Sequence, residues 1–305
     1  MNARISGLLL ATACGAVLAV QTEGTQSNLV TFYDMPAHVE ALKRNVVSIE
    51  VQNAQSQFEA IGTGCCLNPA DRVILTCAHV VRSTDMCNTY VGINLANGKK
   101  HVGVDTAYVD TIFDLALLVS DSFCPDSEVH ADAYKNLLAP DSLLREGTGL
   151  LMIGFPLGIG TGSRGDHPIT RLGMIAQSVQ LDRCFLVDGT ANPASSGSPV
   201  FLVQRPRRLA GIAKDFRPDL VFRRKGKLVT PDKELAYNSG LTDCVSASAV
   251  LSFWERVDSL RGGLKLEDSS IVRLCAREKG EKGTQHPTLP SRHAGCLSPV
   301  ISTPR

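Results

Sequence analysis

The chain has 305 residues, of which 44% are hydrophobic and 20% are charged, ordinary values for a soluble globular protein of one or two domains. The formal net charge of only +1 gives no reason to expect nucleic acid or another polyanion as a partner. Composition and charge therefore indicate an ordinary folded protein and argue against a nucleic-acid-binding one.

Residues 1–20 resemble a secretory signal peptide. Arg4 precedes the run from Ile5 to Val20, which has almost no polarity, and the small residues near Ala19 suit a cleavage site. The run of about 16 apolar residues is shorter than the 20 or so that a membrane-spanning helix needs. We expect export to the periplasm or the cell exterior, without stable membrane insertion. A lipid anchor at Cys14 and a buried or disordered N-terminus are the alternatives.

The segment from 21 to 148 predicts a short helix followed by many short strands. Residues 21–45 form an N-terminal lead in which Pro36–Arg44 indicates a helix with proline in its first turn. Val46–Val51 alternates as a half-buried strand does, and more apolar runs follow between turn residues. Further strands are expected at 62–67, 73–76, 89–95, 101–109 and 115–119. Together they predict a first β-barrel over residues 46–148, with a linker at about 122–145.

Two polar residues in this half stand at the ends of apolar strands. His79 follows the strand that ends at Thr76, and Asp114 heads the apolar run Leu115–Val119. A buried carboxylate needs a partner because an unpaired interior charge is costly, and an imidazole N–H is a natural one. We therefore expect Asp114 to orient His79. Asp110 is a competing carboxylate, but it does not head the strand.

The segment from 149 to 262 predicts a second barrel and a helix. An amphipathic helix begins after Ser246, a suitable N-cap, and runs to about Leu260. Arg223–Lys227 indicates an exposed basic loop, and residues 263–305, rich in Gly, Pro, Ser and charge, are expected to form a disordered tail. The expected strands are near 149–154, 169–179, 184–188, 199–203, 208–214 and 239–245.

The turn before the strand at 199–203 carries a candidate nucleophile. It runs Asp188-Gly-Thr-Ala-Asn-Pro-Ala-Ser-Ser-Gly-Ser-Pro-Val-Phe201. A tight turn of this kind exposes a side chain and lets backbone N–H groups converge where an oxyanion would form. A hydroxyl is a poor nucleophile at neutral pH, so it needs a base, and the base needs an orienting group. His79 and Asp114 are suited to these two roles.

These segments together resemble the trypsin-like serine peptidases of the chymotrypsin fold, most closely the HtrA-type proteases and their single-domain relatives without a PDZ domain. Thr76–Val81 is similar to the family's T-x-x-H-V-V segment, Asp114–Leu118 to D-L-A-[LV]-L, and Ala194–Pro199 to G-N-S-G-[GS]-P. Leu151–Gly158 is similar to its I-G-x-P-x-G turn, and the resemblance covers about residues 36–260. It implies an all-β fold of two six-stranded antiparallel β-barrels with a C-terminal helix.

The resemblance also implies a serine endopeptidase acting on proteins or peptides. Ser196 is expected to attack the scissile carbonyl, His79 to take and return its proton, and Asp114 to fix the His tautomer. Ser195 and Ser198 are rivals for the nucleophile, but the family pattern places it directly before a glycine. This mechanism needs no cofactor and no metal.

One position departs from the family. The backbone N–H groups of Ala194 and Ser196 are expected to form the oxyanion hole, but the family strongly prefers glycine where this chain has Ala194. If φ there is positive, alanine is strained by about 1–2 kcal/mol. A catalytically weak or inactive binding protein with the protease fold therefore stays open, as does an esterase using the same three residues.

The substrate pocket is expected to include residues just before the nucleophile and on a neighbouring strand. These residues are Thr190, Ala191, Gly211, Ile212 and Ala213. No acidic residue stands where a preference for Arg or Lys would need one. The resemblance favours a small to medium apolar side chain.

Ten cysteines make the disulfide pattern uncertain from sequence alone. The candidate bridges are Cys65 or Cys66 with Cys77, and Cys184 with Cys244. Buried thiols are the alternative. In the tail, Cys275, His293 and Cys296 have poor spacing for metal binding, so no metal site is expected.

Overall fold

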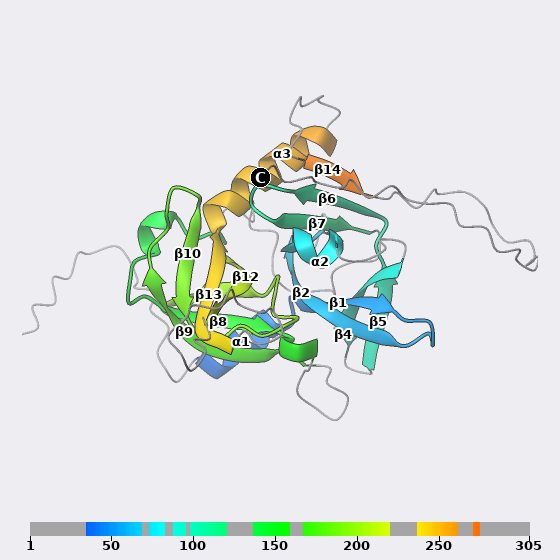
Figure 1. Ribbon diagram of the computed structural model, residues 1–305, viewed down its shortest axis with the longest axis horizontal. Helices are drawn as coiled ribbons and strands as arrows, with labels where there is room; N and C mark the ends of the chain where they lie inside the picture. The colour runs from blue at the N-terminus through cyan, green and yellow to red at the C-terminus, as the bar shows by residue number, and fades with distance from the viewer. Residues whose placement is uncertain are drawn as a thin grey trace, which may run out of the picture.

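The computed structural model describes residues 35–68, 73–82, 88–95, 98–120, 137–158, 167–219, 237–261 and 271–274. Within them the chain forms two β-sheets side by side, with helix α3 (Ala247–Arg261) running along the top from the second sheet to the first (Figure 1). None of the described helices is long and apolar enough to span a bilayer. The expected signal segment, the basic loop at 223–227 and the Cys and His residues of the tail lie outside the described residues.

The first sheet is built from the N-terminal half of the chain. Its eight antiparallel strands follow the order β14-β6-β7-β3-β2-β1-β4-β5. They are β1 Val46–Gln52, β2 Phe58–Asn68, β3 Val73–Cys77, β4 Thr89–Leu95, β5 Gly98–Gly103, β6 Thr106–Asp110, β7 Leu115–Val119 and β14 Ile271–Leu274. Only Val104 and Asp105 separate β5, at one edge, from β6, near the other. The sheet therefore curls into a half-barrel, and β3 at its centre is buried along its whole length.

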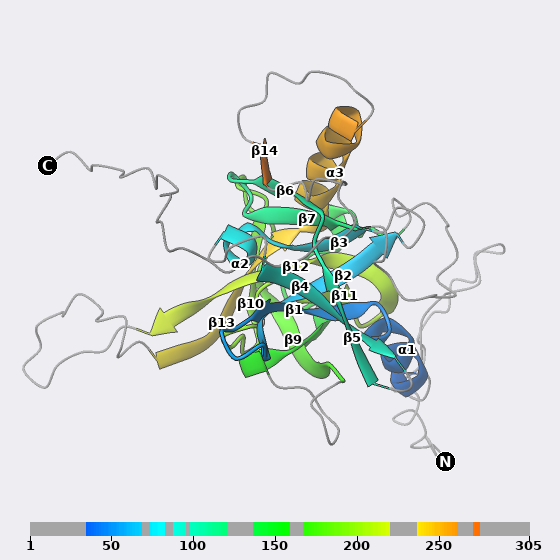
Figure 2. The same cartoon turned by 90° about the vertical axis from the view of Figure 1, so that its right-hand side faces the viewer.

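The second sheet closes into a six-stranded barrel with the order β10-β13-β12-β11-β8-β9. Its strands are β8 Gly149–Gly154, β9 Ile169–Gln177, β10 Cys184–Asp188, β11 Pro199–Leu202, β12 Arg205–Asp219 and β13 Tyr237–Ser246. Buried apolar side chains such as Leu150, Phe185 and Val200 fill it. The far ends of β12 and β13 project from the barrel as a two-stranded ribbon (Figure 2).

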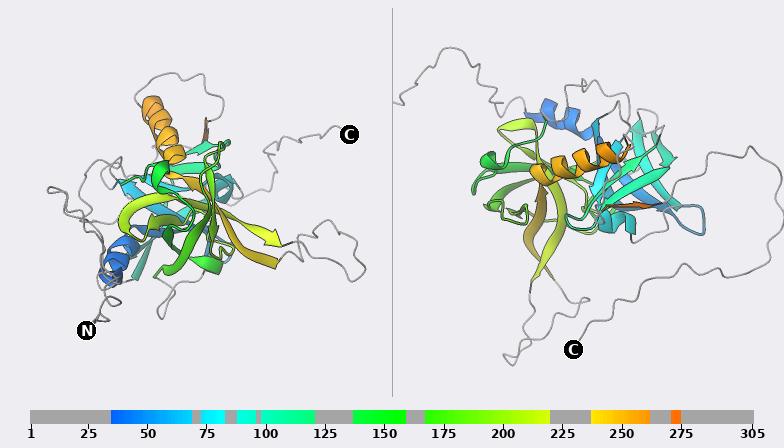
Figure 3. Two further views of the ribbon diagram at one scale, coloured as in Figure 1. Left: turned by 90° about the vertical axis from the view of Figure 1, so that its left-hand side faces the viewer. Right: turned by 90° about the horizontal axis from the view of Figure 1, so that it is seen from above.

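The described part also contains two further α-helices, α1 (Met35–Lys43) and α2 (Ala78–Arg82), and two short 3-10 helices, η3 (Asp141–Leu143) and η4 (Pro156–Gly158). Seen from above, α1 and α3 lie along the two sheets (Figure 3). The buried face of α3 includes Val250, Phe253, Trp254 and Val257, which join the apolar core of the first sheet. The all-β prediction with two packed sheets and a C-terminal helix is confirmed.

Three details of that prediction were wrong. The strand expected over 101–109 is two strands, because the chain turns a corner at Val104 and Asp105, where it leaves β4 and begins to pair with β7. The first sheet has eight strands instead of six. Residues 271–274, inside the segment expected to be disordered, form β14, which pairs with the edge of β6.

Both candidate disulfides were wrong as well. Cys65, Cys77, Cys184 and Cys244 are free thiols, whereas Cys66 is disulfide-bonded. Leu75, not Cys77, lies opposite Cys65, and Cys184 lies opposite Val245. Because side chains alternate along a strand, Cys184 and Cys244 point to opposite faces of the barrel wall. Burial raises the pKa of the Cys65 thiol to about 12, so this thiol stays neutral.

Candidate active site

His79 and Asp114 come together because strands β3 and β7 are paired. Cys77 at the end of β3 lies opposite Leu115 at the start of β7, so the residues just beyond each strand meet. The backbone N–H of Ala78 donates to the Asp114 carbonyl oxygen at 2.9 Å. Asp114 has φ 58°, a left-handed conformation that aspartate tolerates better than most residues. The sheet register therefore brings the carboxylate to the start of helix α2.

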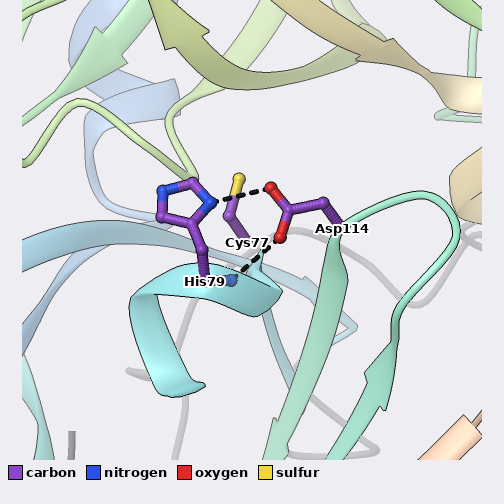
Figure 4. A group of neighbouring side chains, drawn as sticks. All are labelled: Cys77, His79 and Asp114. Atoms are coloured by element: carbon purple, nitrogen blue, oxygen red, sulfur yellow. Dashed lines mark hydrogen bonds and ion pairs between the residues drawn. The ribbon is translucent and has the colours of Figure 1, made fainter. Parts of the chain in front are cut away.

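The Asp114 carboxylate contacts His79 at two points (Figure 4). Oδ1 accepts the backbone N–H of His79 at 2.9 Å, and Oδ2 lies 2.7 Å from the imidazole Nδ1. An ionised carboxylate only accepts, so Nδ1 carries the hydrogen and Nε2 keeps its lone pair. The His79 side chain is 47% exposed and that of Asp114 is 17% exposed, so the ring is open while the carboxylate behind it is shielded. The ring is thus prepared to accept a proton at Nε2.

Asp110, the competing carboxylate, has other partners. It is fully buried, and its Oδ1 accepts the backbone N–H groups of Ile112 at 2.7 Å and Phe113 at 3.0 Å. Its Oδ2 pairs with the guanidinium of Arg256 on helix α3. Asp110 therefore stabilises a turn and attaches α3 to the first sheet.

The loop that carries Ser196, between β10 and β11, is joined to the end of strand β3. The Ser196 carbonyl oxygen accepts the backbone N–H of Thr63 on β2 at 2.9 Å. The Gly197 N–H and the Cys77 Sγ both donate to the carbonyl oxygen of Ala213, at 2.8 and 3.3 Å. These shared contacts bring the serine loop of the second barrel against the part of the first sheet that leads into helix α2.

The serines of this loop differ in exposure. Ser196 is partly exposed, whereas Ser195 and Ser198 are fully buried. Ser195 Oγ accepts the backbone N–H of Asn192 at 3.1 Å. Within the described residues Ser196 Oγ makes no hydrogen bond to His79, and such bonds often form only once substrate is bound. Of the three serines, Ser196 is therefore the one that a substrate can reach.

The two expected oxyanion donors are free of other described partners. Neither the Ala194 N–H nor the Ser196 N–H donates to another residue in the described part of the chain. The carbonyl of Pro193 accepts the Leu157 N–H at 2.6 Å. In a trans peptide the next N–H points the opposite way, so the Ala194 N–H is directed away from Leu157. Ala194 has φ 64°, the positive angle that the family's glycine would adopt more easily.

Replacing Ala194 by glycine is expected to increase the rate of the chemical step. Relief of about 1–2 kcal/mol of backbone strain makes the loop conformation easier to populate, and about 1.4 kcal/mol corresponds to a tenfold rate. The measurement is the rate of fluorophosphonate labelling. Ser56→Gly is the matched control, because Ser56 has φ 60° in a distant turn. This substitution should make the fold more stable and leave the labelling rate unchanged. An unchanged labelling rate for Ala194→Gly would count against the strain argument.

The residues expected to line the substrate pocket differ in exposure. Thr190 is exposed and borders a small cavity together with residues of β8 and β9. Ala191 and Gly211 are buried. Ile212 and Ala213 are fully buried in the apolar cores of the first and second sheets. Strand alternation sends these two side chains into packed interiors on opposite faces of β12, and the substrate pocket itself stays a prediction.

Cys77, His79 and Asp114 bring together donor atoms of the kinds that bind zinc, all within 4.8 Å of one another (Figure 4). These donors already have protein partners, since both carboxylate oxygens contact His79 and the Cys77 Sγ donates to Ala213. Burial, and after it the neighbouring Asp114 carboxylate, hold the pKa of the Cys77 thiol well above its usual range. The sulfur is therefore a neutral thiol, which is neither a nucleophile nor a ready metal ligand.

Two residues that support the serine loop gave no signal in the sequence. Thr63 Oγ1 donates to the Ala194 carbonyl oxygen at 2.9 Å and accepts the Phe155 N–H at 3.0 Å. The Arg171 guanidinium donates to Ser195 Oγ at 2.7 Å. A threonine or an arginine within a strand is ordinarily expected to face solvent. Only the pairing of distant segments reveals these roles.

Comparison with known proteins identifies a family and a fold that this chain resembles. Residues 62–212, which include His79, Asp114 and Ser196, match a family model described as the trypsin-like peptidase domain. No curated protein matches the sequence. The HtrA-type protease AlgW with a decapeptide is similar in fold, with a TM-score of 0.51 and 15% identity, and the match covers 80% of each chain.

Two other solved structures are similar at lower TM-scores. AlgW with a tripeptide gives 0.48 at 17% identity, covering 74% of this chain and 63% of that one. The MamO protease domain of Magnetospirillum magneticum gives 0.46 at 14% identity, covering 70% and 97%. The chain thus spans 63% of the length of the AlgW chain in the first of these, and identities this low bear on the fold alone. The match of residues 62–212 to the trypsin-like peptidase domain, together with the similarity in fold to AlgW with a decapeptide, indicates a trypsin-like peptidase domain with the chymotrypsin fold.

Proposed function

We propose that the chain is a serine endopeptidase that cleaves peptide bonds through Ser196, His79 and Asp114. The observation that carries the proposal is the two-point contact of Asp114 with His79, at 2.9 and 2.7 Å, which leaves Nε2 as a proton acceptor. The Ser196 loop also lies against the end of strand β3 that leads to His79, because Cys77 Sγ and the Gly197 N–H both donate to the Ala213 carbonyl oxygen.

In the first half of the proposed reaction, Ser196 Oγ attacks the scissile carbonyl carbon while His79 Nε2 takes the hydroxyl proton. The N–H groups of Ala194 and Ser196 stabilise the negative oxygen of the tetrahedral intermediate, and one such donor is worth about 2.7–4 kcal/mol in well-studied proteases. His79 then protonates the leaving amine, and the C–N bond breaks to leave an acyl-enzyme. Asp114 stabilises the imidazolium at Nδ1 throughout.

In the second half, water replaces the amine in the site. His79 takes a proton from the water, which attacks the acyl carbon, and the C–O bond to Ser196 breaks as Oγ regains its proton. Proteins or peptides with a small to medium apolar side chain before the scissile bond are the proposed substrates. None of these steps uses a cofactor.

A serine-reactive fluorophosphonate tests the proposal directly. The wild-type protein should be labelled on Ser196, as located by peptide mapping, and His79→Ala should remove most of the labelling because the hydroxyl loses its base. Both proteins are compared by circular dichroism to show that they are folded. A folded wild type that is not labelled would overturn the proposal.

One observation supports a second candidate, a binding protein that keeps the peptidase fold with little turnover. Ala194 holds φ 64° where glycine is the easier residue, so the oxyanion site is reached at a cost in strain. An esterase is the third possibility, because esters have better leaving groups and need less help from the site. Comparing turnover of a peptide and of its matched ester, with labelling as the reference, separates the three.

We also propose that the chain is exported. The apolar segment at 5–20 resembles a signal peptide, and disulfides such as that of Cys66 persist mainly in oxidising compartments. Export should leave a mature N-terminus near residue 20 in the periplasmic or secreted fraction. Recovery of the protein with its N-terminus intact in the cytoplasmic fraction would contradict this.

A further inference from the structure

The side chain of Arg171 contacts the serine loop at two points. Arg171 lies on β9, opposite Met152 of β8. One terminal nitrogen of its guanidinium donates to the Thr190 carbonyl oxygen, and the other donates to Ser195 Oγ at 2.7 Å. These two contacts bracket residues 191–194 of the loop, and the second one reaches the residue directly before the candidate nucleophile.

The surroundings of this guanidinium are unusual for an arginine. It forms no ion pair with an acidic residue of the described chain, and its Nε is buried without a hydrogen-bond partner there. Burial lowers the pKa of the Arg171 guanidinium. Arg217, by contrast, stands on the surface and pairs with Asp243 at 3.0 Å. A cation that is partly withdrawn from water without a nearby counter-charge opposes folding, and the hydrogen bonds of Arg171 to the loop offset that cost.

The loop has a conformation that needs such support. Ala194, between the two Arg171 contacts, has φ 64°. Two hydrogen bonds hold the loop on its other side. The Leu157 N–H donates to the Pro193 carbonyl oxygen at 2.6 Å, and Thr63 Oγ1 donates to the Ala194 carbonyl oxygen at 2.9 Å. A strained angle persists only where surrounding contacts over-determine it, and Arg171 supplies the contacts from the barrel interior.

We propose that Arg171 is a positioning residue for catalysis: its guanidinium, bonded to Thr190 and Ser195, holds the loop so that the Ala194 and Ser196 N–H groups converge on the oxyanion. This inference rests on the proposed peptidase function. Arg171 acts through the backbone it supports and does not itself touch the reacting atoms.

The neighbouring space allows a variant that should still fold. Arg171 borders a cavity of about 10 Å³, the room of about one water, whose lining also includes Leu150, Met152 and Val187. Methionine at this position keeps the apolar stem and adapts to such gaps, while it removes both hydrogen bonds. Lysine keeps the charge but presents a single ammonium, which is a poor substitute for two separated donors.

The test measures kcat, KM and the fluorophosphonate labelling rate of Ser196. Arg171→Met should lower kcat and the labelling rate about 10²- to 10³-fold, the effect of losing one oxyanion donor, with KM little changed. Arg171→Lys should give an intermediate loss. Arg217→Met is the control, because it removes a surface arginine that has no contact with the loop.

A double variant separates positioning from a merely structural role. If Arg171 supports the strained angle of Ala194, adding Ala194→Gly should recover at least about tenfold of the labelling rate lost in Arg171→Met. A purely structural role would lower the melting temperature and leave the labelling rate of the folded protein, and this coupling, unchanged. If the wild type is labelled but the labelling rate does not change in Arg171→Met, the role of Arg171 is overturned and the proposed peptidase function is not. If the wild type itself is not labelled, the proposed function is overturned.

Discussion

Replacing Asp114 by asparagine is expected to lower kcat about 10⁴-fold with little change in the fold, a magnitude typical of this substitution in a Ser-His-Asp triad. The geometry gives the reason. The carboxylate accepts two hydrogens from His79, the backbone N–H at Oδ1 and the imidazole N–H at Oδ2. An asparagine side chain has one acceptor and one donor end, so it can serve only one of the two.

The two orientations of that asparagine have different consequences. If its oxygen accepts the His79 backbone N–H, its amide group faces Nδ1 and favours the tautomer that carries the hydrogen on Nε2. A protonated Nε2 cannot take the hydroxyl proton of Ser196, so the reaction stops at its first step. If the amide turns round, the backbone N–H of His79 is left unpaired and the ring loses its second anchor.

Asp110→Asn is the matched control for this prediction. Asp110 is buried four residues earlier, and its partners are two backbone N–H groups and Arg256. Its substitution should lower the free energy of unfolding by up to about 3 kcal/mol while the labelling rate of Ser196 stays unchanged. Stopped-flow labelling and urea unfolding of both variants check this. Equal rate losses for the two variants would show that Asp114 contributes only to stability.

Most of the fold could be predicted because short apolar runs between turn residues are a local property of the sequence. Residues 46–51 alternate as a half-buried strand does, 115–119 and 184–188 are short apolar runs of strand length, and the structure has strands at all three places. The corner at Val104 and Asp105 could not be predicted. Apolar alternation continues through it, and what divides β5 from β6 is a change of partner strand, from β4 to β7.

Strand β14 was missed for a related reason. Ile271–Leu274 is a four-residue run in a polar, glycine-rich stretch, and it becomes a strand because it pairs with the edge of β6. Such pairing depends on where the sheet edge lies in space. The disulfide predictions failed similarly, since the separation of Cys184 and Cys244 across the barrel wall depends on register and not on spacing in the chain.

In the candidate site, too, residues in local sequence segments could be identified, whereas contacts between distant segments could not. His79, Asp114 and Ser196 were identifiable because each stands at the end of an apolar strand in a short, recognisable segment. The contacts of Arg171 and Thr63 with the serine loop join residues 19 or more positions apart, and neither residue type predicts them. Ile212 and Ala213, expected in the wall of the substrate pocket, are both buried, and the face of β12 on which each side chain lies depends on the packing of the two sheets and not on position in the chain.

Gly197→Ala is expected to abolish most activity and to destabilise the fold. Gly197 has φ 87°, and a Cβ there would overlap the carbonyl oxygen of Thr63 and the Oγ1 of Thr76. The Thr63 oxygen is backbone within β2 and also accepts Thr76 Oγ1 at 2.7 Å, so it cannot retreat without disturbing the β2–β3 pair. The serine loop must move instead, and a displacement of about 1 Å at the nucleophile costs on the order of 10²-fold in rate.

Gly147→Ala distinguishes the strain of a positive φ from the steric overlap of the added Cβ. Gly147 has φ 80°, close to that of Gly197, but nothing lies within 4 Å of where its Cβ would be. Its substitution should cost only the strain of a positive φ, about 1–2 kcal/mol, and leave the labelling rate unchanged. The difference between the two variants in melting temperature and labelling rate therefore measures the overlap with Thr63 and Thr76. If Ser196 is labelled as fast in Gly197→Ala as in Gly147→Ala, the contact between the two sheets does not position Ser196. The proposal that Ser196 and His79 form one site would then be wrong.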